Sequence, residues 1–125
     1  MVMCEYILEC DLPPSATPEE VAHVQKACNQ RATTQLGGSA KESIAKWRVP
    51  EYALRGDIIR HIKAGRKVFR KYKDKHAGEL ISNDVQANIT LAAGFDIYVE
   101  IWLEDETMIV IYAHDHRPGQ LRLPQ

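Results

Sequence analysis

Apolar and polar residues alternate through the last third of the chain, and this pattern restricts the possible folds more than any other feature. Apolar side chains occupy every second position over residues 85–93 and again over 95–103, with Gly94 between the two runs. A period of two is that of a strand with one buried face. An acidic turn, Glu104-Asp105-Glu106, leads into a third run at 108–112. We therefore expect three consecutive strands, of which the last two form a hairpin.

The N-terminal third predicts a strand followed by a helix. Residues 4–12 alternate in the same way, and Pro13-Pro14 ends that run. The stretch Thr17-Pro18-Glu19-Glu20 then supplies a hydroxyl for the N-cap, a proline for the first helical position and a glutamate that completes a capping box. Apolar residues at helical spacing extend the expected helix to residue 36, where Gly37-Gly38 ends it.

The middle of the chain predicts two more helices. Ser39-Ala40-Lys41-Glu42 repeats the capping-box pattern, and Pro50 interrupts the helix that it begins. A longer helix is expected over 58–76, because residues spaced alternately by four and three share one helical face. The residues of that face are Ile58, Ile62, Gly65, Phe69, Tyr72 and His76. Gly65 weakens this helix or splits it into two shorter ones.

The expected long helix is strongly basic. Nine basic residues and two acids lie between Arg55 and Lys75, so the segment carries a charge of +7, while the remaining residues carry −8. A row of lysines and arginines on one helix face suits a phosphate backbone. The predicted nucleic-acid-binding residues are Arg60, Lys63, Arg66, Lys67, Arg70, Lys71 and Lys73. Pairing of these cations with acids of the same domain, or with an acidic protein, stays open.

Together these elements predict an α+β fold in a single domain over residues 1–125. The expected order is β-α-α-β-β-β, with an antiparallel sheet and helices packed on one face. Pro118-Gly119 turns the chain toward a short additional strand at 120–123. With 125 residues, of which 45% are hydrophobic, the chain can bury one core.

Cysteine usage and hydropathy point to the cytoplasm. The three cysteines, Cys4, Cys10 and Cys28, lack CxxC spacing and predict reduced, buried thiols. No apolar run approaches the ~18 residues of a membrane span, and the first residues do not resemble a secretory signal. We therefore expect no membrane partner.

Two groups of residues near the C-terminus have side chains suited to chemistry or to binding. In the first, Tyr112, His114, His116 and Arg117 follow one another at a strand end, and they are the candidate catalytic residues, able to supply general acid, general base and positive charge. The two histidines are alternatively metal ligands, or the segment is simply a polar strand end. No further ligands are evident by spacing, so neither a metal nor a cofactor is expected.

In the second group, Tyr98 and Trp102 share the polar face of their strand and flank Glu100. They are candidates for a homodimer or partner interface, for base stacking, or for a small second cluster covered by a terminal segment. A hairpin turn of two or four residues places Tyr112 and His114 on the opposite face, whereas a three-residue turn places all four on one face.

The last third resembles the strand-hairpin ending of RelE/ParE-type toxins. The similarity covers about 30 residues by pattern, at 94–102 and 108–123, together with the order of elements. In place of the basic residue that commonly follows the glutamate of the penultimate strand, this chain has Ile101-Trp102. The resemblance implies a small ribosome-associated mRNA endonuclease that needs no metal, with Tyr112, His114 and Arg117 as its catalytic positions.

Two functions follow as hypotheses. The first is a nucleic-acid-binding protein, for RNA ahead of DNA, with a metal-independent ribonuclease toxin as its enzymatic form. The alternative is a non-enzymatic interaction module, such as an immunity protein, an antitoxin or an inhibitor of a nucleic-acid-handling complex. A metal-dependent enzyme is a third option, which bound metal in the purified protein would support.

Overall fold

The structure is a computed structural model that describes residues 12–74, 79–120 and 122–125, without side chains at 72–82. Three helices and five strands make up the described residues. The helices are α2 (Pro18–Cys28), α3 (Gly38–Trp47) and α4 (Glu51–Lys63), and a 3-10 turn, η2 (Arg31–Thr33), follows α2. The strands are β1 (Thr34–Leu36), β2 (Phe69–Asp74), β3 (Glu79–Thr90), β4 (Asp96–Leu103) and β5 (Ile109–His114).

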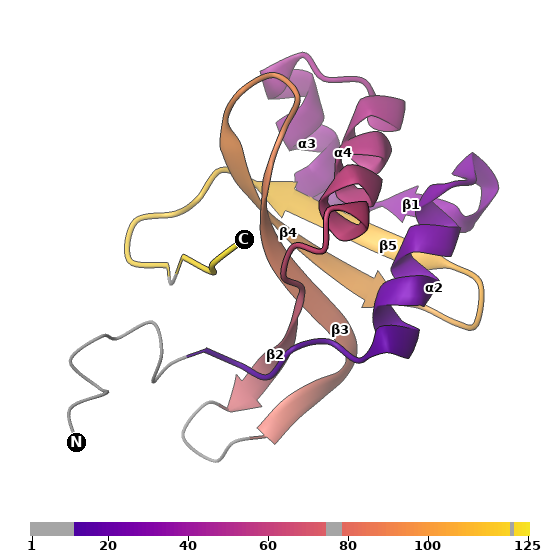
Figure 1. Cartoon of the computed structure of the whole chain (residues 1–125). Helices are drawn as coiled ribbons and strands as arrows, with labels where there is room; N and C mark the ends of the chain where they lie inside the picture. Colours follow the sequence, from indigo (N-terminus) through magenta and orange to yellow (C-terminus); the bar gives the residue numbers. More distant parts are fainter. Residues whose placement is uncertain (1–11, 75–78, 121) are drawn as a thin grey trace.

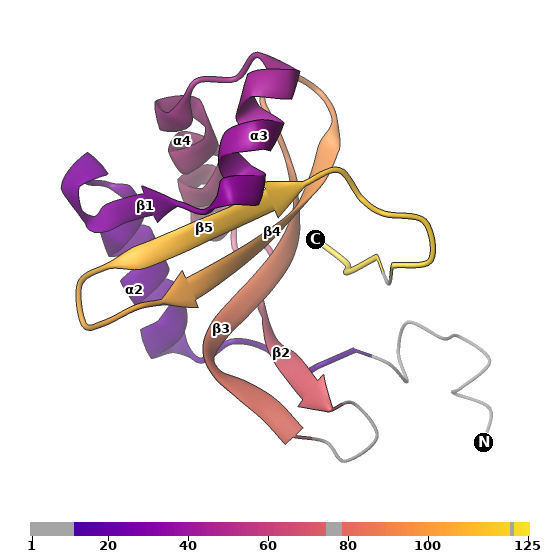
Figure 2. The ribbon, with the colours of Figure 1, turned by 180° about the vertical axis from the view of Figure 1, so that it is seen from behind.

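One sheet runs through the molecule in the order β1-β5-β4-β3-β2, and all three helices lie against the same side of it (Figures 1 and 2). The pairs β2–β3, β3–β4 and β4–β5 are antiparallel, whereas β1 runs parallel to β5. The predicted α+β fold with helices on one face is confirmed. The sheet is mixed rather than purely antiparallel, because β1 adds a parallel strand at its edge.

The core lies between the helices and the apolar side of the sheet. Alternate residues of β3, β4 and β5 face the helices, where Leu54 and Ile58 of α4 and Val24 of α2 meet them. Cys28 is also buried there, which confirms its prediction as a buried thiol. Burial raises the pKa of this thiol to about 12, so it stays protonated at neutral pH.

The first predicted helix is too long. It begins with the expected capping box at Thr17 but ends at Cys28. The hydroxyls of Thr33 and Thr34 both donate to the carbonyl oxygen of Ala27, at 2.8 and 2.9 Å. Residues that follow the helix thus supply hydrogen bonds to a carbonyl group of its last turn. The next helix begins after Gly37, which has no side chain to cap it, and the capping box predicted from Ser39 is therefore wrong.

The predicted long basic helix is wrong in its second half. Helix α4 ends at Lys63, and Gly65 adopts a φ of +72°, a left-handed conformation that glycine favours. The backbone N–H groups of Gly65 and Arg66 close the helix by donating to Ile62 and His61. Residues from Phe69 onward then pair with β3 as a strand. The cations are thereby divided among a helix end, a turn and a strand.

The predictions for the two ends of the chain have different outcomes. The strand predicted at 4–12 lies outside the described residues, apart from Leu12. Of the strand predicted at 120–123, the described residues Gln120, Arg122 and Leu123 are not in a strand. Within the described parts of the chain, no helix is both long and apolar enough to cross a membrane.

Candidate active site on the uncovered face of the sheet

The register of the last hairpin decides which side chains share a face. In the antiparallel pairing of β4 with β5, Tyr98 lies opposite His114, Glu100 opposite Tyr112, and Trp102 opposite Val110. The hairpin has the three-residue turn, since the N–H of Glu104 donates to the carbonyl oxygen of Met108 at 3.0 Å. The aromatic pair and the histidine segment therefore meet on one side of the sheet.

We call the side of the sheet opposite the helices the open face (Figure 2). Besides the residues of β4 and β5, it carries alternate residues of β3, which lie opposite those of β4. The residues used below are Phe69 and Lys71 from β2; Asp84, Gln86 and Asn88 from β3; Tyr98, Glu100 and Trp102 from β4; and Tyr112 and His114 from β5.

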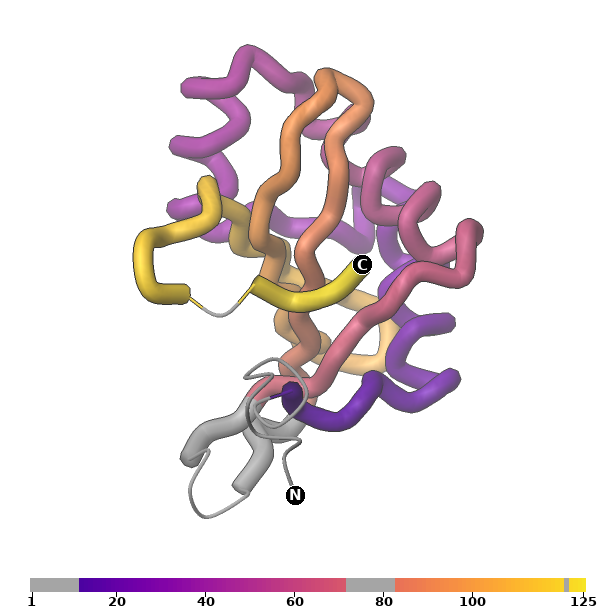
Figure 3. The backbone as a smooth tube through the Cα atoms, turned by 60° about the vertical axis from the view of Figure 1, so that its left-hand side comes forward, coloured from indigo at the N-terminus to yellow at the C-terminus, as the bar shows by residue number. Residues whose placement is uncertain are grey.

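The C-terminal segment covers one end of the open face (Figure 3). Leu123 packs against Phe69 and Tyr98, and its backbone N–H donates to the Oδ1 atom of the buried Asn88. Tyr98 is only 5% exposed and its hydroxyl donates to Gln86 at 2.8 Å. It is thus part of a small second cluster covered by the C-terminal segment, which was one of the alternatives for this pair, and the partner interface stays a prediction.

Beyond this cluster the open face is partly accessible. Trp102 is half-buried, and Tyr112 is 40% exposed. The Tyr112 ring lies over Gly37, where an added Cβ atom would be 2.3 Å from the ring. Any side chain at position 37 would therefore displace the ring. The glycine thus leaves room for the Tyr112 ring.

A pair of carboxyl groups lies at the centre of the open face. Asp84 is 4% exposed and is hydrogen-bonded to Glu100, which also accepts a 2.6 Å bond from the Nζ atom of Lys71. Burial, the hydrogen bond and the charge of Glu100 together raise the pKa of Asp84 to about 8, although Lys71 opposes the shift. Asp84 is therefore the protonated partner at neutral pH, and it donates to Glu100.

Glu100 is the ionised partner of the pair. Burial by itself would raise its pKa, but the hydrogen bonds from Asp84 and Lys71 and the positive charge of Lys71 lower it overall, and His114 adds to this whenever its ring is charged. Two carboxyl groups with pKa values displaced in opposite directions are the usual basis for assigning an acid and a base in an active site. The pair holds one proton that can be moved at neutral pH.

Replacing Asp84 with asparagine should flatten the dependence of stability on pH. The folded chain keeps the Asp84 proton up to about pH 8, whereas an unfolded chain loses it near 3.8. Unfolding therefore releases a proton between these values, and the free energy of unfolding falls as pH rises through this window, by at most ~1.4 kcal/mol per pH unit. Urea unfolding at pH 5, 6, 7 and 8 gives the free energy of unfolding at each pH, and the slope compared is its change per pH unit. Equal slopes in the wild type, in Asp84→Asn and in the turn control Glu106→Gln would contradict the assignment.

His114 offers a ring nitrogen on the open face. Its Nδ1 atom lies 2.7 Å from the carbonyl oxygen of Asp115, and because a carbonyl only accepts, Nδ1 carries the proton. Nε2 is then left as an acceptor. The ring packs beside Tyr98, with centroids 5.0 Å apart. Asp115 has a different role, since its carboxylate accepts bonds from Lys46 and Trp47 of α3, at 2.6 and 2.9 Å.

The four predicted catalytic residues lie on two consecutive segments of the chain. Tyr112 and His114 share the open face, but β5 ends at His114, so His116 and Arg117 belong to the segment that follows. His116 is half-buried and Arg117 is exposed. The structure joins the first two to the carboxyl pair instead, a combination that sequence reasoning missed. The sequence feature that could have indicated this combination is Glu100, an acid that lies between two aromatic residues on one face of its strand.

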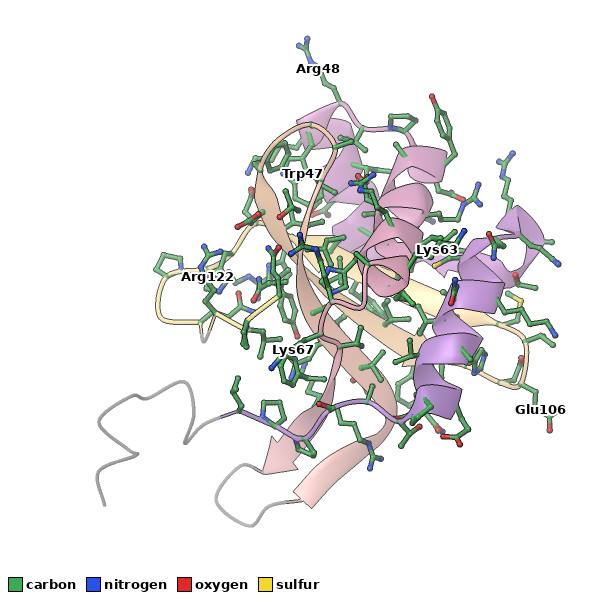
Figure 4. The ribbon with its side chains drawn as sticks, in the orientation of Figure 1. Trp47, Arg48, Lys63, Lys67, Glu106 and Arg122 are labelled. Carbon is green, nitrogen blue, oxygen red and sulfur yellow. The ribbon has the colours of Figure 1, made fainter. Side chains whose placement is uncertain are left out.

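The predicted phosphate-binding cations are also separated. Three of them contact acids: Arg60 lies 2.6 Å from Asp57, Arg70 3.6 Å from Glu20, and Lys71 2.6 Å from Glu100. Lys63, Arg66 and Lys67 are exposed around the end of α4, where Figure 4 labels the two lysines. The side chain of Lys73 lies outside the described residues. The predicted row of cations on one helix face is therefore wrong, because α4 ends at Lys63 and residues 69–74 form β2.

Neither a metal site nor a relative identifies the function. Among the described residues, no group of three or more histidine, cysteine, aspartate or glutamate side chains is arranged to hold a metal ion. Comparisons with protein-family models, with curated proteins and with solved structures find no match to this chain.

Proposed function

We propose that this protein binds single-stranded RNA across the open face and cleaves it by attack of a ribose 2′-OH. One observation carries the proposal: a single strand register gathers His114, the Asp84–Glu100 pair and the rings of Trp102 and Tyr112 on a face that none of the helices in the described residues covers. Sheet faces of this kind bind single strands by stacking bases on aromatic rings.

Binding would combine stacking with a modest electrostatic contribution. The exposed Arg66 and Lys67, in the turn before β2, attract phosphates, while Arg60, Arg70 and Lys71 are engaged by acids. With about two phosphate contacts, the logarithm of affinity should fall with a slope near −1.4 against the logarithm of salt concentration. Binding driven by stacking alone would give a slope near zero.

The proton transfers can be assigned to residues of the open face. Nε2 of His114 takes the proton from the 2′-OH, and the 2′-oxygen attacks the adjacent phosphorus. The bond from phosphorus to the 5′-oxygen breaks, and that oxygen receives the proton held by the carboxyl pair. Lys71, which is paired with Glu100 at 2.6 Å, would supply positive charge to the phosphate as negative charge develops on it. The products are a 2′,3′-cyclic phosphate and a 5′-hydroxyl.

A cleavage assay in the presence of a chelator tests this proposal. Single-stranded RNA is incubated with the full chain in EDTA, and the same sequence as DNA serves as the control. Cleavage of the RNA alone, with cyclic phosphate ends, is expected. A shift in electrophoretic mobility without cleavage would reduce the function to RNA binding, and the absence of both would contradict the proposal.

A protein partner at the same face is the second candidate. Its support is that a half-buried tryptophan and an exposed tyrosine, residues enriched at interfaces, both lie on the open face. The two candidates respond differently to substitution. Trp102→Ala weakens binding under both, whereas His114→Gln leaves a protein interaction unchanged and removes RNA cleavage.

A further inference from the structure

The end of β5 is held by helix α3. Strand β1 pairs with β5 only as far as the bond from the N–H of Gly37 to the carbonyl oxygen of Ile111, at 2.8 Å. Carbonyl groups two residues apart on a strand point to the same edge, so that of Ala113 lies beyond the end of β1. It accepts a 2.7 Å bond from the hydroxyl of Ser43 in α3. A side chain of α3 thus takes the place of a strand neighbour immediately before His114.

The residue that follows His114 is held by the same helix. The carboxylate of Asp115 accepts bonds from Nζ of Lys46 at 2.6 Å and from Nε1 of Trp47 at 2.9 Å. The bond from Lys46, followed by the bond from Trp47, lowers the pKa of Asp115, although burial opposes the shift. The carboxylate is therefore ionised at neutral pH. Trp47 is itself fixed, because its ring packs edge-to-face on Phe95 with centroids 5.7 Å apart.

The backbone of Asp115 determines which ring nitrogen of His114 is free. Its carbonyl oxygen lies 2.7 Å from Nδ1, which carries the proton for this reason. In a neutral imidazole, the hydrogen bond made by one nitrogen fixes the state of the other. Nε2 is therefore an acceptor as long as this carbonyl group stays in place.

We propose that Asp115 is a positioning residue for His114, with Trp47 as its main anchor. The carboxylate, bonded to α3, holds the Asp115 peptide so that its carbonyl oxygen keeps the His114 proton on Nδ1. Nε2 is then ready to take the proton of a ribose 2′-OH. Lys46 contributes less than Trp47, because its side chain is 71% exposed. The role in the reaction rests on the proposed function, whereas the state of the ring can be measured without RNA.

The ¹⁵N resonances of the His114 ring test the proposal on the full chain alone, at pH 7.5, where an ordinary imidazole is mostly neutral. In the wild type the proton should lie on Nδ1. Asp115→Ala should move a large share of it to Nε2, and Trp47→Phe, which removes only the donor, a smaller share. Asp115→Asn keeps an oxygen for Trp47 and should leave the proton on Nδ1. Glu42→Ala, which removes an exposed acid of the same helix, should change neither resonance.

Single-turnover cleavage of RNA then relates the state of the ring to the reaction. Asp115→Ala should lower the rate about tenfold or more, with RNA affinity changed less than about twofold, because a group that orients another acts on the chemical step. Asp115→Asn should stay within about threefold of the wild type.

A proton on Nε2 in the wild type, or an unmoved proton in Asp115→Ala, would overturn the proposal. Equal losses of rate in the alanine and asparagine variants would also overturn it, by attributing the effect to the charge of Asp115. A wild-type chain that does not cleave RNA would contradict the proposed function instead, and the ring resonances would still decide whether Asp115 positions His114.

Discussion

His114→Gln is expected to lower the rate of RNA cleavage by about 10² to 10⁴-fold at pH 7, while RNA affinity changes by less than about threefold. The substitution removes the ring nitrogen that takes the 2′-OH proton. Glutamine keeps a polar side chain of similar length, so it disturbs the neighbouring Tyr98 ring little. Rate and affinity are measured separately, by single-turnover cleavage and by binding to a 2′-O-methyl RNA that cannot react.

A matched histidine provides the control for this experiment. His23 lies on α2, on the other side of the sheet, so His23→Gln should cleave at the wild-type rate. Equal activity of the His114→Gln and wild-type proteins would remove His114 from the mechanism. Equal losses in both variants would attribute the effect to stability instead.

Glu100→Gln is expected to lower the cleavage rate by about 10²-fold and to change its pH profile. In the wild type, the proton-donating pair loses its proton near the pKa of Asp84, which is about 8, so activity should fall above that pH. Glutamine removes the negative charge that helps to hold the Asp84 proton, and it removes the carboxylate that Lys71 contacts at 2.6 Å. The fall in activity should therefore move from about pH 8 to lower pH, and most of the activity should be lost.

Glu104→Gln, an exposed substitution at the end of the same hairpin, controls for the loss of one negative charge. Its rate and pH profile should match those of the wild type. A Glu100→Gln protein with normal activity and an unchanged alkaline limb would show that the carboxyl pair has only a structural role.

The final hairpin and its apolar face could be predicted from the sequence, because a strict alternation of apolar and polar residues is typical of a strand with one buried face. The register could not, since residues 104–108 are compatible with several turn lengths. Two strands were also missed. Three residues at 34–36 are too few to show a period, and they form a strand only because Ile109 and its neighbours pair with them. In the sequence, Phe69 and Tyr72 fit one face of a helix. In the structure, the chain turns at Gly65 and these two residues pair with β3 instead.

The candidate site shows the same division. Tyr112, His114 and Trp102 could be named from residue type and position alone. Asp84 could not, because its proximity to Glu100 depends on a pairing between strands, in which Asp84 lies opposite Trp102. The basic segment was misjudged for the related reason that its charge pattern does not show which acids will contact Arg60, Arg70 and Lys71.

Mapping of RNA contacts by NMR tests the central claim most directly, that the open face is the nucleic-acid-binding surface. The ¹⁵N-labelled chain is titrated with a non-cleavable single-stranded RNA. The account predicts shifts of the backbone resonances of Glu100, Trp102, Tyr112 and His114 and of the Trp102 indole, with those of α2 unmoved. Shifts confined to the helices, or none at RNA concentrations that saturate binding, would contradict it.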